Sequence, residues 1–245
     1  MKAKDGTDKA QGGRLMGPIA QRLLEYIEVG AIAILLAFFL RTFVVEAFMI
    51  PTGSMEDTLL RGDHILVNRM IYNTKGLGPL EKILPVREPE RHDVMVFKNP
   101  QNMKLDYIKR MVGMPEDTVS CRSKLLSING KEASYSFERH ASPWVIPRQR
   151  NVRDNFGPIK VPRDNYFMMG DNRDNSLDSR YWGTLDGRLI KGQAFLVYFS
   201  WAPFKDVFEN KGYAERPHSL AELLWFNITH LGDRLRFQRF LQLIR

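Results

Sequence analysis

The sequence has little cysteine and none of the common nucleic-acid motifs. Cys121 is the one cysteine among 245 residues, so no disulfide can form within the chain and no cysteine-based metal cluster can be assembled. The net charge of +8 calls for an anionic partner, but no zinc-finger spacing and no basic recognition helix accompany it. A phospholipid membrane therefore fits this charge better than nucleic acid. We expect no nucleic-acid partner, no obligate metal and no organic cofactor.

The sequence also lacks a long uncharged hydrophobic run. Val29 to Leu40 gives 12 uncharged residues, which as a helix would span only about 18 Å of a hydrocarbon core about 30 Å thick. Extension from Tyr26 to Val45 gives 20 residues, with Glu28 and Arg41 near the ends, where long side chains can reach the interface. This pattern predicts a transmembrane helix over residues 25–46.

Two other interpretations of this run stay open at this point. A cleaved signal peptide also has about 12 apolar residues, and Val45-Glu46-Ala47 resembles a small-x-small cleavage site. The second alternative is that the run forms a buried helix of a soluble domain. Five basic residues precede the run, which would place a tail of residues 1–24 in the cytoplasm if the run is retained as an anchor.

After the apolar run, short β-branched stretches alternate with turn residues. This spacing predicts a mainly β fold, an antiparallel sheet or barrel domain over residues 47–205, without helices between the strands. Asn129-Gly130 is a hairpin turn signal. Residues 134–163 are polar and aromatic and read as a long insertion. The stretches that we expect to be strands are 64–68, 93–97, 105–112, 117–121, 125–130, 166–170 and 193–201.

The last residues, 206–245, predict a helical extension. Ser219 and Glu222 have the spacing of a capping box before an apolar stretch. The final stretch mixes arginines with leucine, isoleucine and phenylalanine. Such a helix could lie on anionic lipid or pack on the β domain, and the sequence leaves both open.

Ser54 is a candidate nucleophile in a flexible turn shortly after the apolar run. It lacks the G-x-S-x-G elbow of common serine hydrolases, because Thr52 and Glu56 occupy the glycine positions. None of the five histidines lies in a recognisable triad context. Lys109 stands in an apolar strand beside Tyr107 and is the alternative base, since burial can lower a lysine pKa enough to leave part of it neutral. Lys109 has a second interpretation. Its side chain would then extend into solvent from a strand edge or pair with a carboxylate, without a role in catalysis.

Three segments resemble the sequence boxes of bacterial type I signal peptidases. They are MIPTGSMEDTLLRGDHILVN (49–68), LDYIKRMVGMPEDTV (105–119) and GDNRDNSLDSRYWG (170–183), in the family's order and spacing. The family consists of membrane-anchored serine proteases that remove signal peptides from exported preproteins. The resemblance implies that the apolar run is retained as a single-pass anchor in the bacterial inner membrane. The N-terminus would be cytoplasmic and the catalytic domain would lie on the outer, periplasmic side.

The resemblance also implies a role for each matched polar residue. Ser54 would attack the scissile carbonyl with Lys109 as general base. The backbone N–H of Ser54 and the hydroxyl of Thr52 would form the oxyanion hole. The remaining implied residues support this pair: Ser176 orients the lysine amine, Asp178 and Arg180 form a salt bridge, and Asp171 supports their loop.

The implied substrate is an extended peptide with small residues, typically alanine, at the first and third positions before the cut. Its backbone would add a strand to residues 48–52 and 105–108. The implied pocket residues are Phe48, Ile50, Pro51, Met55, Leu59, Tyr107 and Ile108, for which core packing is the simpler interpretation.

The chain departs from the family pattern at two positions. Asp57 replaces the usual proline of SMxPTL, and Glu116 replaces the glycine of GxPGD. Two other functions remain in competition. A Ser/Lys autoprotease like the SOS repressors would require an N-terminal DNA-binding helix pair, where this chain has an apolar run. A non-enzymatic membrane-anchored β module would leave the serine, the lysine and the last box unexplained.

Overall fold

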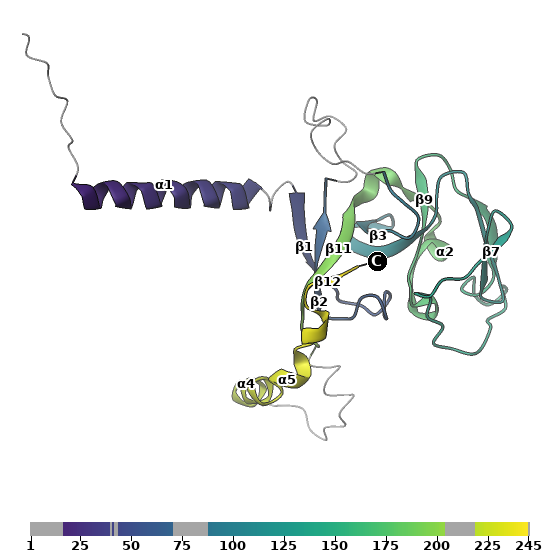
Figure 1. Ribbon diagram of the computed structural model, residues 1–245. Helices are drawn as coiled ribbons and strands as arrows, with labels where there is room; N and C mark the ends of the chain where they lie inside the picture. Colours follow the sequence, from purple (N-terminus) through teal and green to yellow (C-terminus); the bar gives the residue numbers. More distant parts are fainter. Residues whose placement is uncertain (1–16, 40, 42–43, 71–87, 204–218, 245) are drawn as a thin grey trace, which may run out of the picture. The chain divides into compact units, whose positions relative to one another are not determined.

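A computed structural model describes residues 17–39, 41, 44–70, 88–203 and 219–244. The chain divides into two units, Met1–Thr42 and Phe43–Arg245. The first unit contains one described helix. The second contains all the described strands and the remaining helices (Figure 1).

The first unit contains helix α1, Pro18–Phe39. Its first residue is a proline, which fits the start of a helix because the missing N–H has no partner there in any case. The expected helix over 25–46 is wrong at both ends. Val45 and Glu46 belong to strand β1 and pair with Asn68 and Val67, so sheet pairing overrides the apolar run. No described helix combines enough length with enough hydropathy to cross a membrane.

The larger sheet of the second unit contains eight strands. Their order in space is β1-β2-β11-β3-β4-β9-β10, with β12 paired to β11, and every pairing is antiparallel (Figure 1). The mainly β, antiparallel fold expected from the sequence is therefore confirmed. The strands are β1 Val45–Met49, β2 Asp63–Asn68, β3 Val94–Asn99, β4 Asn102–Gly113, β9 Asn165–Met169, β10 Leu185–Asp186, β11 Ile190–Ser200 and β12 Gln242–Leu243.

A smaller sheet has the order β7-β6-β5-β8. Asn129 and Gly130 form the turn between β6 and β7, both with positive φ, as the hairpin signal predicted. The expected insertion over 134–163 is too long, because residues 156–160 pair with β5 as strand β8. Residues 134–155 remain without a strand or helix and are called the insertion below. The strands are β5 Thr118–Arg122, β6 Leu125–Ile128, β7 Lys131–Ala133 and β8 Phe156–Lys160.

The C-terminal residues are helical only in part. Helix α4, Leu220–Thr229, begins at the predicted cap, where the Ser219 side chain accepts the N–H of Glu222. Residues 234–244 pack on the β domain, but not as the single helix that we expected. They form a short helical turn and then strand β12 (Figure 1). The other short elements are η3 Arg173–Asn175, α2 Ser179–Trp182, η4 Gly187–Leu189, α5 Leu231–Arg234 and η5 Phe237–Arg239.

Candidate active site

Ser54 and Lys109 are in direct contact although they are 55 positions apart in the sequence. The Lys109 Nζ donates one hydrogen bond of 2.7 Å to the Ser54 Oγ and a second of 2.8 Å to the backbone carbonyl of Ile108. Both residues are buried, with Ser54 7% exposed and Lys109 4% exposed. A serine hydroxyl this close to an amine can pass its proton to the neutral form of that amine, which creates a nucleophile.

Ser54 is carried by the connection between β1 and β2. We call residues 50–63, which include the first residue of β2, the Ser54 loop. Two backbone hydrogen bonds of 2.8 Å close its base, from the Ile50 N–H to Asp63 and from the Gly62 N–H to Ile50. Met55 and Leu59 are fully buried in a core cluster formed by β2, β3, β4 and β11. The loop is therefore fastened to the larger sheet on both sides of its turn.

The environment of Lys109 increases the neutral fraction of its amine. Burial lowers the pKa of Lys109 from 10.5 to about 8, while the nearby carboxylates of Asp178 and Asp171 act against that change and Arg180 adds to it. With a pKa of about 8, roughly one amine in ten is neutral at pH 7, compared with about one in three thousand for an unperturbed lysine. The site thus contains a usable base without a histidine.

The turn after β9 lies against the backbone of Ser54. Gly170 permits this approach, because a side chain there would overlap the Ser54 carbonyl oxygen and the Ser176 hydroxyl. Asn172 donates its backbone N–H to the Ser54 carbonyl at 3.1 Å and its side-chain amide to the Gly53 carbonyl at 3.1 Å. The segment 170–183 therefore fixes the backbone on which the nucleophile stands.

Ser176 is buried near this turn, but it does not make the bond that the family resemblance implies. No group in the described part of the chain meets the Ser176 Oγ at hydrogen-bond geometry. The two hydrogen bonds from the Lys109 amine go to Ser54 and Ile108 instead. An ammonium group has three N–H donors, so one remains that Ser176 could accept. The orientation of Lys109 by Ser176 stays a prediction.

Asp178 and Arg180 form a buried ion pair at the start of α2. The guanidinium donates two hydrogen bonds of 2.8 Å to the carboxylate, which also accepts the N–H of Gly170 at 3.0 Å. Burial alone would raise the pKa of Asp178, but the charge and hydrogen bonds of Arg180 lower it, helped by the Gly170 N–H. Asp178 therefore stays ionised and ties the turn at Gly170 to α2.

Asp171 binds a residue that the sequence analysis missed. Arg110, in β4 beside Lys109, donates hydrogen bonds of 2.8 and 2.7 Å to the two carboxylate oxygens of Asp171, and both side chains are almost fully buried. Thr58, in the Ser54 loop, donates its hydroxyl to the same carboxylate at 2.6 Å. The available signal was the pair Lys109-Arg110, since adjacent strand residues face opposite sides and both sides of this strand are buried.

The two proposed oxyanion donors are not used by the protein itself. Thr52 is exposed. Neither its hydroxyl nor the Ser54 N–H forms a hydrogen bond to another residue in the part of the chain that the structure describes. Both groups are therefore available to a carbonyl oxygen of a bound peptide.

The expected pocket residues fall into two groups. Four of them, Ile50, Met55, Leu59 and Ile108, belong to one core cluster, and Met55 and Leu59 have no exposed surface. Met55 and Leu59 therefore pack the core here instead of lining an open pocket, which is the simpler interpretation allowed from the sequence. Phe48 and Tyr107 are half-buried and Pro51 is exposed, so these three keep surface that a peptide can touch.

Asp57 occupies its position with a backbone that proline cannot adopt. Its φ is +84°, in the left-handed region, whereas the proline ring fixes φ near −65°. The Asp57 carboxylate accepts a hydrogen bond of 3.2 Å from Arg139 of the insertion, which also lies 3.4 Å from Glu56. Where the family has proline, this chain shapes the turn with an aspartate and an arginine contact.

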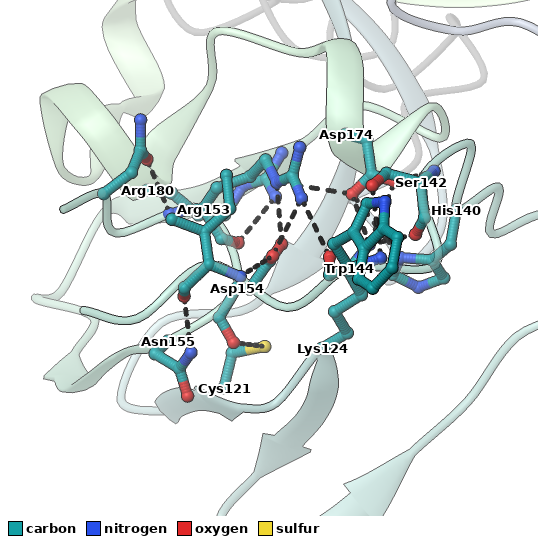
Figure 2. A network of polar contacts seen from close by, with 12 residues as sticks. Cys121, Lys124, His140, Ser142, Trp144, Arg153, Asp154, Asn155, Asp174 and Arg180 are labelled. Atoms are coloured by element: carbon teal, nitrogen blue, oxygen red, sulfur yellow. Dashed lines mark hydrogen bonds and ion pairs between the residues drawn. The ribbon is translucent and has the colours of Figure 1, made fainter.

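A polar network joins the insertion to the segment 170–183 (Figure 2). The Asp174 carboxylate accepts hydrogen bonds from Lys124 at 3.0 Å and from the Ser142 N–H at 2.7 Å. Arg153 lies 3.4 Å from Asp174, and its carbonyl accepts a hydrogen bond of 2.9 Å from Arg180. The sequence analysis missed these partners because they are distant from one another in the chain. Polar side chains in a loop are also expected to be exposed to solvent.

Cys121 lies at the edge of this network. Its thiol is buried and donates to the carbonyl of Asp154 at 3.4 Å. Burial raises the pKa of Cys121 to about 11, so the thiol stays protonated.

Comparison with known proteins places the chain in a family. A family model described as "Signal peptidase, peptidase S26" matches residues 23–201. The chain belongs to this family. Signal peptidase I of Pseudomonas aeruginosa is 38% identical over 208 residues, which cover 73% of each chain. Signal peptidase I P of Bacillus subtilis subsp. natto is 33% identical over 178 residues, covering 72% of this chain and 89% of that one.

A solved structure also matches, over a shorter part of the chain. The crystal structure of a signal peptidase I from Enterococcus faecalis is 31% identical, covers 44% of this chain and 97% of that one, and superposes with a TM-score of 0.37. The family membership confirms the resemblance noted in the sequence and makes the chain a serine-type peptidase. The non-enzymatic β module is thereby excluded.

Proposed function

We propose that the chain is a membrane-located serine endopeptidase that removes N-terminal signal peptides from exported preproteins. The observation that carries this proposal is the 2.7 Å hydrogen bond between the Lys109 Nζ and the Ser54 Oγ, both buried, in a chain of the signal peptidase family. A nucleophile and a base in contact, with no histidine beside them, support acyl transfer by a serine and a lysine.

The reaction proceeds through an acyl-enzyme. Neutral Lys109 takes the proton of the Ser54 hydroxyl as the Oγ attacks the scissile carbonyl. The negative charge that develops on the carbonyl oxygen is stabilised by the Ser54 N–H and the Thr52 hydroxyl, which are both available. Protonated Lys109 then gives its proton to the leaving amine. A water molecule, deprotonated by the same lysine, hydrolyses the ester and restores both groups.

Five residues hold this pair in place. Asp171 and Arg110 fasten Thr58, and with it the Ser54 loop. Asp178 and Arg180 fasten the turn at Gly170, which lies against Ser54. Ser176 receives the third N–H of the Lys109 ammonium when the reaction charges that amine.

The substrate binds as an added strand. Among the described strands, β1 pairs with β2 alone, which leaves its other edge without a described partner strand. Residues 106–108 of β4 pair with β3 on one side, while pairing with β9 begins at Arg110. Two open edges next to the Ser54 loop support pairing with an extended peptide. Phe48, Pro51 and Tyr107 contact its side chains, and the packed core behind them fits a preference for small residues such as alanine.

The proposed location is the inner membrane, with one anchor and the catalytic domain outside. The apolar side chains of α1 from Ile32 to Phe39 are exposed, as a lipid-facing helix requires, and the family relatives are signal peptidases. We place the anchor in α1, the cytoplasmic tail before it, the peptidase domain from Val45 at the start of β1 to residue 205, and an extension over residues 206–245. Protease added to intact spheroplasts should remove the domain and leave an α1 fragment that resists carbonate extraction. Release of the whole chain by carbonate would contradict this assignment.

The reaction is tested with a preprotein that carries an Ala-x-Ala site. Purified enzyme in detergent-phospholipid micelles is compared with Ser54→Ala and Lys109→Met, and the mass of the product gives the cut position. We expect the wild type to cut after the second alanine and both variants to be inactive. Equal cleavage by all three proteins would show that another protease is at work and would remove the support for this mechanism.

A further inference from the structure

The C-terminal segment returns to the β domain from outside the region that matches the family. The family match ends at residue 201, yet β12 pairs with β11 through Leu243 and Leu196. The Ile244 N–H donates to the Phe195 carbonyl at 3.0 Å, and the Ile244 side chain packs on the core cluster below the Ser54 loop. We call residues 234–244 the C-terminal clasp.

The clasp places Arg239 on a buried carboxylate at the end of the Ser54 loop. Asp63 has 0% exposure and accepts hydrogen bonds from the Leu60 N–H at 2.8 Å and from Ser200 at 2.6 Å. Arg239 donates to both of its oxygens, at 2.6 Å from Nη2 and 3.1 Å from Nε. Without this guanidinium, Asp63 would be a buried charge whose hydrogen bonds come from neutral donors, with the Arg236 guanidinium 3.8 Å away, which is costly.

The same guanidinium also reaches the middle of the loop. The Arg239 Nη2 donates to the backbone carbonyl of Thr58 at 2.8 Å. The Thr58 hydroxyl donates to Asp171 at 2.6 Å on its other side. Thr58 is therefore held between the clasp and the segment 170–183, four positions after Ser54.

We propose that Arg239 is a positioning residue for Ser54, acting through Thr58 and Asp63, so that the C-terminal clasp is part of the peptidase site. This inference rests on the proposed role of Ser54. It gives the C-terminal clasp, which lies outside the family match, an effect on the rate of cleavage. A displacement of the nucleophile of about 1 Å can reduce a rate about a hundredfold, so the loss of such an anchor should appear in kcat.

Arg239→Gln and Arg239→Lys test the proposal, with Arg188→Gln as the matched control. Arg188 pairs with Asp186 at the surface, and its side chain is 90% exposed. Steady-state cleavage of the Ala-x-Ala preprotein is measured well below the melting temperature of each variant. We expect Arg239→Gln to lower kcat about tenfold to a hundredfold with little change in KM. Arg239→Lys should lower kcat less than Arg239→Gln does. A lysine keeps the positive charge, but it lacks the planar fork of donors with which Arg239 binds Asp63 and Thr58 at the same time.

A double variant separates positioning from simple charge neutralisation. In Asp63→Asn with Arg239→Gln the buried charges are removed together, so the melting temperature should return toward that of the wild type. If Arg239 positions the loop through the Thr58 carbonyl, kcat stays low in this double variant. Full recovery of kcat would overturn the proposal, as would a wild-type kcat in Arg239→Gln. Activity that survives Ser54→Ala would instead defeat the proposed function itself, whatever Arg239 does.

Discussion

The two halves of the Ser54 loop are held by different kinds of contact. Residues 50–57, which include Ser54, accept one backbone and one side-chain hydrogen bond from Asn172 and are contacted by the half-exposed Arg139. Residues 58–63 are bound by the buried ion pairs of Asp171 with Arg110 and of Asp63 with Arg239. Broken buried pairs cost far more than broken exposed ones. The ion pairs that cost most to break therefore hold the second half of the loop, and the charged contacts of the first half are weaker.

The largest effect is expected from the buried side of the loop. Arg110→Gln leaves the Asp171 carboxylate buried without its guanidinium, which should lower the free energy of unfolding by about 3–5 kcal/mol. Urea unfolding followed by circular dichroism measures this change. Arg188→Gln is the exposed control and should leave the midpoint unchanged. A loss below about 1 kcal/mol in Arg110→Gln would mean that water or another donor replaces the guanidinium.

The pH dependence of cleavage tests the burial of Lys109. Because burial lowers its pKa to about 8, kcat/KM should rise about tenfold per pH unit up to pH 8 and then level off. Stability should change in the same direction: between about pH 8 and 10.5 the unfolded chain binds more protons at this lysine than the folded chain, so stability rises with pH. Rates measured from pH 5.5 to 10 give the midpoint. A midpoint near 10 would show that Lys109 is solvated in solution.

A smaller effect is expected at Asp57, in the first half of the loop. Asp57→Pro restores the family pattern, but proline cannot adopt the φ of +84°, so stability should fall by more than about 1 kcal/mol and kcat should fall with it. Asp57→Gly is the matched control, because glycine adopts this φ without strain and also lacks the carboxylate. If the proline variant is as active as the glycine variant, the turn can take a second conformation.

The smallest effect is expected from Arg139. Its side chain is 39% exposed, and its partner Asp57 is 60% exposed, so solvent screens the pair and Arg139→Gln should change kcat/KM by no more than about threefold. Preprotein cleavage at low and at high salt measures the change, which should shrink further as salt rises. A loss as large as that of Arg239→Gln would contradict the division of the loop into a strongly held and a weakly held half.

The strands and the sheet could be predicted from the sequence because alternation and turn residues are local signals. The contact between Ser54 and Lys109 could not be derived in that way. Nothing in the two local patterns says that the residues meet, and the expectation came from the family resemblance. The end of α1 was misplaced because Val45 and Glu46 continue an apolar run, and only pairing with β2 makes them a strand. Local patterns therefore give elements but not the contacts between them.

The pocket residues and the supporting charges show the same limit. Met55 and Leu59 were expected in a pocket, but an apolar side chain near a nucleophile serves a core equally well. Arg110 and Arg239 were missed as supports because each one needs a carboxylate far away in the chain to be stable when buried. The clasp was predicted to be a helix from its mixture of arginine and apolar residues. Instead, Arg236 and Arg239 bond to the Ser54 loop, and the end of the clasp adds a strand to β11.

The burial of Cys121 has a practical consequence for spectroscopy. This thiol is the one cysteine of the chain and stays protonated to about pH 11, so maleimide and nitroxide reagents at neutral pH should leave it unlabelled. A cysteine introduced at an exposed position such as Trp144 would then carry the probe alone. Fluorescence or electron paramagnetic resonance of this probe would then report on the surroundings of the insertion in an otherwise unmodified enzyme.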